Sequence, residues 1–154
     1  LTVDTESIHA FIIGEHGDSE LAVWSGANVA GIPIHDFCEF RGHYQHSDAM
    51  EAIYKRVKDS AYEIIDRKGA TYYGIAMAVG HITESIIRNK SSILPVSSLL
   101  TGQYGLSDLY LSIPTIVNRN GAEQVLEISL SDREHMALKK SAETLQQVIA
   151  DLDL

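Results

Sequence analysis

The pattern of hydrophobic and polar positions predicts short strands at the start of the chain. Residues 8–13 form a short, apolar, β-prone run, and residues 21–24 form a second one, so we expect a buried strand at each. Gly26 and the segment Gly31-Ile32-Pro33 then indicate turns or bulges. The polar stretch that follows, residues 35–47, is interpreted as a loop.

Apolar residues at helical spacing predict two consecutive helices in the middle of the chain. The first is expected to begin near Ser47 or Asp48, with Glu51 placed as in a capping box. It ends at Asp66-Arg67-Lys68-Gly69, where basic residues of a last turn precede a glycine. The second runs from about Thr71 to Asn89. The positions expected to face inward are Met50, Ile53, Val57, Ala61 and Ile64 in the first helix, and Ile75, Val79, Ile82 and Ile86 in the second.

The last third of the chain predicts strands that pair through a hairpin. Ser91–Leu100 and Leu109–Asn118 have the composition of strands, and Asn120-Gly121 lies between Leu109–Asn118 and a further strand at Gln124–Leu130. Asn-Gly between two such runs is a strong hairpin signal, and a hairpin joins antiparallel strands. We therefore expect an α+β fold, with a mixed or antiparallel sheet and packed long helices, and not a doubly wound parallel sheet.

A capping box begins the last predicted helix, because Ser131 is followed three residues later by Glu134. The apolar positions on one face of this helix are Leu138, Ala142, Leu145, Ile149 and Leu152. With 154 residues, 45% of them hydrophobic, the chain suits a single domain with a real core.

Composition excludes several classes of protein. The net charge of −9 argues against unassisted binding to nucleic acid or to an anionic membrane. Cys38 is the only cysteine, so an internal disulfide is impossible and a cytoplasmic location fits best. No apolar run is long enough to span a bilayer, and no signal peptide is recognisable. Because the chain begins with Leu1 rather than Met, we expect a segment upstream of it.

A dinucleotide-binding fingerprint is also missing. The nearest pair of glycines, Gly14 and Gly17, flanks a histidine and leads into no obvious helix, and the sequence contains neither Gly-x-Gly-x-x-Gly nor a P-loop. We therefore expect any cofactor-binding domain to lie outside this chain.

His16 is the first candidate for chemistry. It follows a predicted buried strand directly, and glycines on both sides allow a sharp turn and the close approach of a ligand. An imidazole titrates near neutral pH, so it can both accept and donate a proton within one reaction cycle. The alternative is a polar turn whose histidine merely ends the strand.

A metal site is the less favoured interpretation of a second group of residues. His35, Cys38, His43 and His46 lie close together in the predicted loop. The segment has no paired Cys-x-x-Cys and no glutamate placed as a hydrolytic base, so a solvated loop is preferred and no metal is expected.

Four blocks of sequence resemble L-lactate dehydrogenases, in order along nearly the whole chain. The first is Ile13-Gly14-Glu15-His16-Gly17-Asp18-Ser19, which is similar to the active-site motif of that family. The second is Asp66-Arg67-Lys68-Gly69-Ala70-Thr71-Tyr72-Tyr73-Gly74-Ile75-Ala76, and the third is Ser92-Ile93-Leu94-Pro95-Val96-Ser97. The fourth is Ile113-Pro114 with Asn118-Arg119-Asn120-Gly121. Malate dehydrogenases share the fold but usually lack the Glu-His-Gly-Asp-Ser motif.

The resemblance implies roles for individual residues. His16 would be the proton donor and acceptor in the interconversion of lactate and pyruvate, with NAD as the hydride carrier. Thr71 would line the substrate pocket, and Ile75 would lie against the nicotinamide ring. From the residues alone, an ordinary helix-start threonine is the favoured interpretation of Thr71, and plain core explains Ile75 at least as well. The orienting aspartate and the carboxylate-binding arginine of the family precede the point where this chain begins.

His9 is the third candidate. Bacterial lactate dehydrogenases that respond to fructose 1,6-bisphosphate carry a phosphate-binding histidine here, at a subunit interface, so the resemblance implies an effector role. His9 lies seven positions before His16, so strand alternation would put the two on opposite faces. The alternative is a strand histidine bonded to a neighbour.

The resemblance predicts the C-terminal, substrate-side half of a cytoplasmic enzyme, a homotetramer by family habit, whose N-terminal Rossmann half binds most of the NAD. The partners expected are pyruvate or lactate, the N-terminal half and further copies of the chain. The alternatives are a malate dehydrogenase and a non-catalytic assembly module in which His16 is a vestige.

Overall fold

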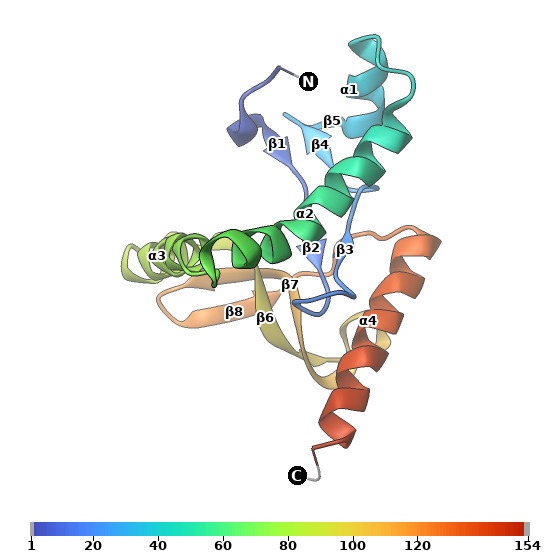
Figure 1. Ribbon diagram of the computed structural model, residues 1–154. Helices are drawn as coiled ribbons and strands as arrows, with labels where there is room; N and C mark the ends of the chain where they lie inside the picture. The colour runs from blue at the N-terminus through green and yellow to red at the C-terminus, as the bar shows by residue number, and fades with distance from the viewer. Residues whose placement is uncertain (1, 153–154) are drawn as a thin grey trace.

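The computed structural model describes residues 2–152 (Figure 1). The first part of the chain consists of five two-residue strands and a short helix: β1 (Ile8–His9), β2 (Ile12–Ile13), β3 (Leu21–Ala22), β4 (Asn28–Val29), β5 (Ile32–Pro33) and α1 (Ile34–Phe40). The rest consists of long elements: α2 (His46–Lys68), α3 (Tyr73–Ile87), β6 (Ser92–Thr101), β7 (Ser107–Asn118), β8 (Gly121–Val125) and α4 (Asp132–Ala150). Single 3-10 turns lie at Thr5–Ser7 and Gln103–Gly105.

All strand pairs in the described residues are antiparallel, which confirms the predicted α+β fold. The strands form three sheets, in the orders β1-β4-β5, β2-β3 and β6-β7-β8. In Figure 1 the first sheet lies beside α1 at one end of α2, and the β6-β7-β8 sheet lies near the other end, next to α3. The small β2-β3 sheet lies between them, with α4 beside β3. The site described below begins at β2.

The main core lies around β7, between the β2-β3 pair and α4. Leu109, Leu111 and Ile113 of β7 are buried with Ile13 of β2 and Leu138 of α4. A second cluster joins α1 to the start of α2 through Ala27, Val29, Ile34, Cys38 and Met50. Within residues 2–152, no helix is both long and apolar enough to cross a membrane.

The predicted strand at residues 8–13 is not continuous, so that prediction was wrong. Ile8 pairs with Val29, whereas Ile12 pairs with Ala22, so the chain changes sheets between them. The physical reason is competition for hydrogen-bonding partners, because each half of the run finds a different strand. Strand alternation therefore does not relate His9 to His16, and the inference of opposite faces fails.

The predicted loop at residues 35–47 was wrong at both ends, because residues 35–40 belong to α1 and residues 46–47 to α2, and only residues 41–45 lie outside helices and strands. Pro33 precedes the helix and has the fixed φ that suits a helix start. Burial of Ile34 and Cys38 stabilises this short helix. α2 begins at His46 after Gln45, with no side-chain cap, so the predicted capping role of Glu51 is not observed.

Helix ends and the hairpin were predicted well. Gly69 ends α2 with a left-handed φ of 79°, and Ser131 and Glu134 form the predicted capping box of α4. The hairpin pairs Asn118 with Gly121, although its second strand is Gly121–Val125 rather than Gln124–Leu130, which lies mostly beyond the paired residues.

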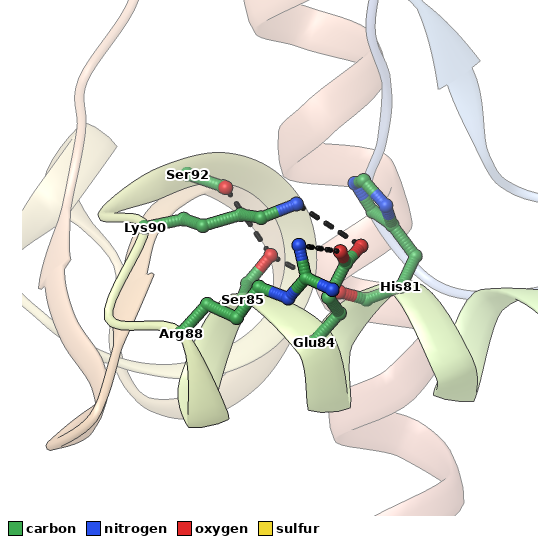
Figure 2. Close-up of polar contacts among 6 residues, drawn as sticks. All are labelled: His81, Glu84, Ser85, Arg88, Lys90 and Ser92. Carbon is green, nitrogen blue, oxygen red and sulfur yellow. Dashed lines mark hydrogen bonds and ion pairs between the residues drawn. The ribbon is translucent and has the colours of Figure 1, made fainter.

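The predicted apolar stripe of α2 is mostly exposed, and that of α3 is exposed in its first half, whereas Ile82 and Ile86 in its second half are partly buried. Ile53 and Val57 of α2, and Ile75 and Val79 of α3, are all about half exposed or nearly so, and only Met50 is buried among the predicted positions in α2. Periodicity locates an apolar face but does not say whether its partner belongs to the same chain. α3 is fixed at its far end, where Arg88 and Lys90 contact Glu84 and the Ser85 hydroxyl bonds Ser92 (Figure 2).

Candidate active site at the turn after β2

The turn that carries His16 begins at Gly14, where β2 meets the middle of β7. Gly14 and Ser112 exchange two backbone hydrogen bonds of 2.9 Å. Gly14 has a φ of +101°, which favours glycine. A Cβ at this position would lie 2.7 Å from Ser141 Oγ and 3.1 Å from Leu21 Cδ2. The first glycine of the motif is therefore required by both conformation and space.

The carboxylate of Glu15 closes the turn from within. Its Oε2 accepts hydrogen bonds from the Ser19 hydroxyl at 2.7 Å and from the Ser19 backbone N–H at 3.2 Å. Glu15 Oε1 lies where a Cβ on Gly17 would be only 2.2 Å away. Ser19 holds the Glu15 carboxylate in this position. Residue 17 must therefore lack a Cβ, and glycine meets that requirement.

Helix α2 holds the turn from outside through two tyrosines. The Tyr54 hydroxyl donates a short hydrogen bond to the backbone carbonyl of Glu20. About two helical turns further along α2, the Tyr62 hydroxyl donates to Asp18 Oδ1 at 3.1 Å. The turn is thus fixed by side chains that are remote in sequence.

His16 itself is exposed, on a turn whose neighbouring residues are held. Within residues 2–152 its imidazole makes no hydrogen bond, so its ring nitrogens are available to a ligand. Its imidazole interacts electrostatically with the Glu20 carboxyl. Burial raises the pKa of the Glu20 carboxyl above 4.5, and His16 and Lys58 offset that rise only in part. An exposed imidazole on a fixed backbone can exchange a proton with a bound molecule.

The other predicted site residues lie apart from the turn in the described contacts. Thr71 is half-buried between α2 and α3, and Ile75 lies exposed in the first turn of α3. His9 is exposed on β1, opposite Asn28 and in a different sheet from β2. No described contact joins His16, Thr71, Ile75 and His9, although α2 leads from the turn, at Tyr62, to Thr71.

The histidine-rich segment does not form a metal site within the described residues. His35 Nδ1 and His46 Nε2 are 2.5 Å apart, but no group of three or more potential metal ligands occurs in residues 2–152. Cys38 is buried in α1 and faces the core rather than solvent. A cavity of about 420 Å³ lies nearby between α2 and α4, with Glu20, Trp24 and Tyr54 among its walls, and His16 does not line it.

Sequence reasoning missed the residues that hold the turn. Ser141 of α4 and the two tyrosines of α2 contact residues 14–20 across 34 to 126 positions of sequence. A serine among the buried positions of an amphipathic helix, between Leu138 and Ala142, is the one local signal that could have pointed to Ser141.

Fold and turn together define an α+β domain in which an exposed histidine, His16, lies on a turn that is held by hydrogen bonds from α2 and α4. The chain belongs to the lactate/malate dehydrogenase family, whose alpha/beta C-terminal domain matches residues 1–153. It is 53% identical over 152 residues to an L-lactate dehydrogenase of Acetivibrio thermocellus, covering 99% of this chain and 48% of that protein. It is 51% identical to one of Thermoanaerobacter sp. strain X514, with coverages of 99% and 49%.

Solved structures agree with this assignment. A lactate dehydrogenase from a Medee basin deep-sea metagenome library has a TM-score of 0.93 at 41% identity, over 99% of this chain and 48% of that one. The minor L-lactate dehydrogenase of Enterococcus mundtii has a TM-score of 0.91 at 40% identity, over 97% and 48%. The chain therefore spans about half the length of the relatives it matches.

Proposed function

We propose that this chain is the C-terminal, substrate-side half of an NAD-dependent L-lactate dehydrogenase, with His16 as its acid–base group. The observation that carries the proposal is the exposed imidazole on a turn that is fixed on both sides by hydrogen bonds. The identity to L-lactate dehydrogenases over 99% of the chain favours lactate over malate.

The proton transfer follows from the position of His16. In lactate oxidation the neutral imidazole takes the hydroxyl proton as the C–H bond at C2 breaks. In pyruvate reduction the imidazolium polarises the carbonyl and then protonates its oxygen. A positioned acid–base group of this kind contributes about a hundredfold or more to the rate.

Thr71 and Ile75 fit the neighbourhood of a small anion and a cofactor ring. Thr71 precedes the first turn of α3, where a hydroxyl and unpaired backbone N–H groups suit a carboxylate. Ile75 presents an apolar surface that is 54% exposed, and such a surface favours an uncharged ring over a cationic one. When bound, NAD supplies the hydride acceptor or donor. In this proposal most of its binding residues belong to the N-terminal half.

The exposed apolar faces of α2 and α3 support association with other polypeptide. Tyr73, Met77 and Val79 of α3 are all more than half exposed, which is costly for a domain that stands alone in water. In the proposed enzyme the N-terminal half and further copies, in a cytoplasmic tetramer, cover these faces. His9, exposed on β1, contributes to binding fructose 1,6-bisphosphate at a subunit interface.

The test is His16→Gln in the full-length protein, with His43→Gln as the matched control. His43 is also exposed and lies in the connection between α1 and α2. We expect turnover of pyruvate with NADH to fall by at least about a hundredfold for His16→Gln and to stay near the parent value for His43→Gln. The 154-residue chain alone is expected to show no turnover. Normal activity of His16→Gln would refute the proposal, and robust turnover by the chain alone would refute the need for a second half.

A further inference from the structure

A buried serine of the last helix contacts the turn that carries His16. Ser141 of α4 is fully buried, and its Oγ accepts a hydrogen bond of 2.8 Å from the backbone N–H of Glu15, the residue directly before His16. The same Oγ lies 3.3 Å from Ser19 Oγ, on the far side of His16. One hydroxyl therefore touches the turn on both sides of the histidine.

The directions of these hydrogen bonds follow from counting protons. Ser19 has one hydroxyl proton, and it is donated to Glu15 Oε2 at 2.7 Å. Ser19 Oγ must then accept the bond it shares with Ser141, so Ser141 is the donor there. The bonds run from the Glu15 N–H to Ser141, from Ser141 to Ser19, and from Ser19 back to the Glu15 carboxylate. The result is a closed ring that starts and ends at Glu15.

The ring holds the backbone on both sides of His16, through Glu15 and Ser19. Within residues 2–152, the side chain of His16 makes no hydrogen bond. Successive hydrogen bonds in a partly buried network also reinforce one another. The direction in which the imidazole leaves the backbone is thereby set from α4.

The packing around Ser141 agrees with a fitted contact. A Cβ on Gly14 would lie 2.7 Å from Ser141 Oγ and 3.4 Å from Ser141 Cβ, so helix and turn are in close contact here. Leu138, three residues before Ser141, and Ala142, directly after it, are buried in the main core, so α4 is also held there by apolar packing.

We propose that Ser141 is a positioning residue for His16, so that the C-terminal helix sets the geometry of proton transfer. This inference rests on the proposed function, because it needs His16 to act on the substrate. Ser141 does not touch the reactants. It acts through the backbone of Glu15.

The test compares Ser141→Ala with Ser85→Ala in the full-length protein. Ser85 is the matched control, since it is also a fully buried helix serine with two hydrogen bonds, to the His81 carbonyl and to Ser92, and it contacts no residue of the turn (Figure 2). Both variants should lower the melting temperature. Only Ser141→Ala should lower kcat per folded enzyme, by about tenfold, because small misplacements of a reacting group are costly.

A double variant separates positioning from a general structural role. Added to His16→Gln, the Ser141→Ala change should reduce the residual activity by less than about twofold, because the group it positions is already gone. A merely structural role would lower activity equally in both backgrounds. If Ser141→Ala does not accumulate, Ser19→Ala opens the same ring at a less buried position and should show the same dependence on His16.

The outcomes distinguish this inference from the proposed function. If His16→Gln retains normal activity, the proposed function fails and the positioning inference fails with it. If His16→Gln is inactive while Ser141→Ala or Ser19→Ala matches Ser85→Ala in kcat, the positioning inference alone is overturned.

Discussion

Replacing Glu134 with glutamine should destabilise the protein in a way that depends on pH. Glu134 is only 9% exposed, and its carboxylate accepts four hydrogen bonds. Its Oε1 accepts the Ser25 N–H at 2.9 Å, and its Oε2 accepts the Ser131 N–H and hydroxyl, both at 2.8 Å. The Ser25 hydroxyl donates a fourth, short bond to Oε2. The carboxylate thus joins the chain before β4 to the start of α4.

Glutamine cannot reproduce this pattern, because one of its two terminal atoms is a donor. With the amide oxygen at the Oε2 position, the NH₂ group faces the Ser25 N–H. One backbone N–H is then left unpaired, at about 1–3 kcal/mol, and the remaining bonds lose the assistance of a charge. We expect the free energy of unfolding to fall by about 3 kcal/mol at neutral pH.

The sign of the pH dependence follows from the pKa of Glu134. Burial alone would raise that pKa, but the hydrogen bonds from Ser25 and Ser131 outweigh it, so the folded-state pKa lies below the ordinary 4.5. A lowered carboxyl pKa contributes stability that is fully present above pH 4.5 and is lost as pH falls through the folded-state value. The difference between parent and Glu134→Gln should therefore be constant from pH 7 to about pH 5 and shrink below that.

Urea unfolding of the chain, followed by fluorescence, measures this difference. Trp24 is the only tryptophan and precedes Ser25, so it reports on the affected contact. Glu143→Gln is the control, because Glu143 lies exposed on the same helix. It should change the free energy of unfolding by less than about 0.5 kcal/mol. The reasoning would be refuted if Glu134→Gln lowered the free energy of unfolding by no more than Glu143→Gln does. It would also be refuted if the loss for Glu134→Gln did not shrink as the pH falls below about 5.

Two further variants test other parts of the site. Gly14→Ala should cost about 3 kcal/mol, from its φ of +101° and the contact of a Cβ with Ser141, whereas Gly42→Ala, with φ +77° and nothing within 4 Å of its Cβ, should cost only about 1 kcal/mol. Equal losses in urea unfolding would exclude the contact as a cause. Under the proposed effector role, His9→Gln in the full-length protein should raise the concentration of fructose 1,6-bisphosphate needed for half-maximal activation by about tenfold, since a hydrogen bond from His9 to a phosphate would be lost. An unchanged activation curve would remove His9 from the effector site.

The sequence predicted those elements whose signals are local. The capping box at Ser131 and Glu134, the glycine that ends α2, and the turn near Asn120 each depend on residues a few positions apart. Competition between distant strands is not visible in this way. For that reason the break between Ile8 and Ile12 was missed.

Burial was the least predictable property. The stripe Ile75 and Val79 has the spacing of a core face, yet both side chains are about half exposed. Cys38, expected in a solvated loop, is buried, because α1 folds against Met50. In both cases the outcome depends on which other segment covers the residue, and spacing carries no information about that.

The site shows the same division between local and distant causes. The exposure of His16 after a buried strand could be inferred from glycines on either side, whereas the groups that hold the turn come from α2 and α4. Glu134 fixes the first turn of α4, and Ser141 lies seven residues later on the same rigid helix. A change at Glu134 that lets this helix shift would thus also move Ser141 against Glu15. We therefore expect Glu134→Gln to lower kcat of the full-length protein, relative to the parent at the same pH, only while His16 is present, which is the same dependence that we predict for Ser141→Ala.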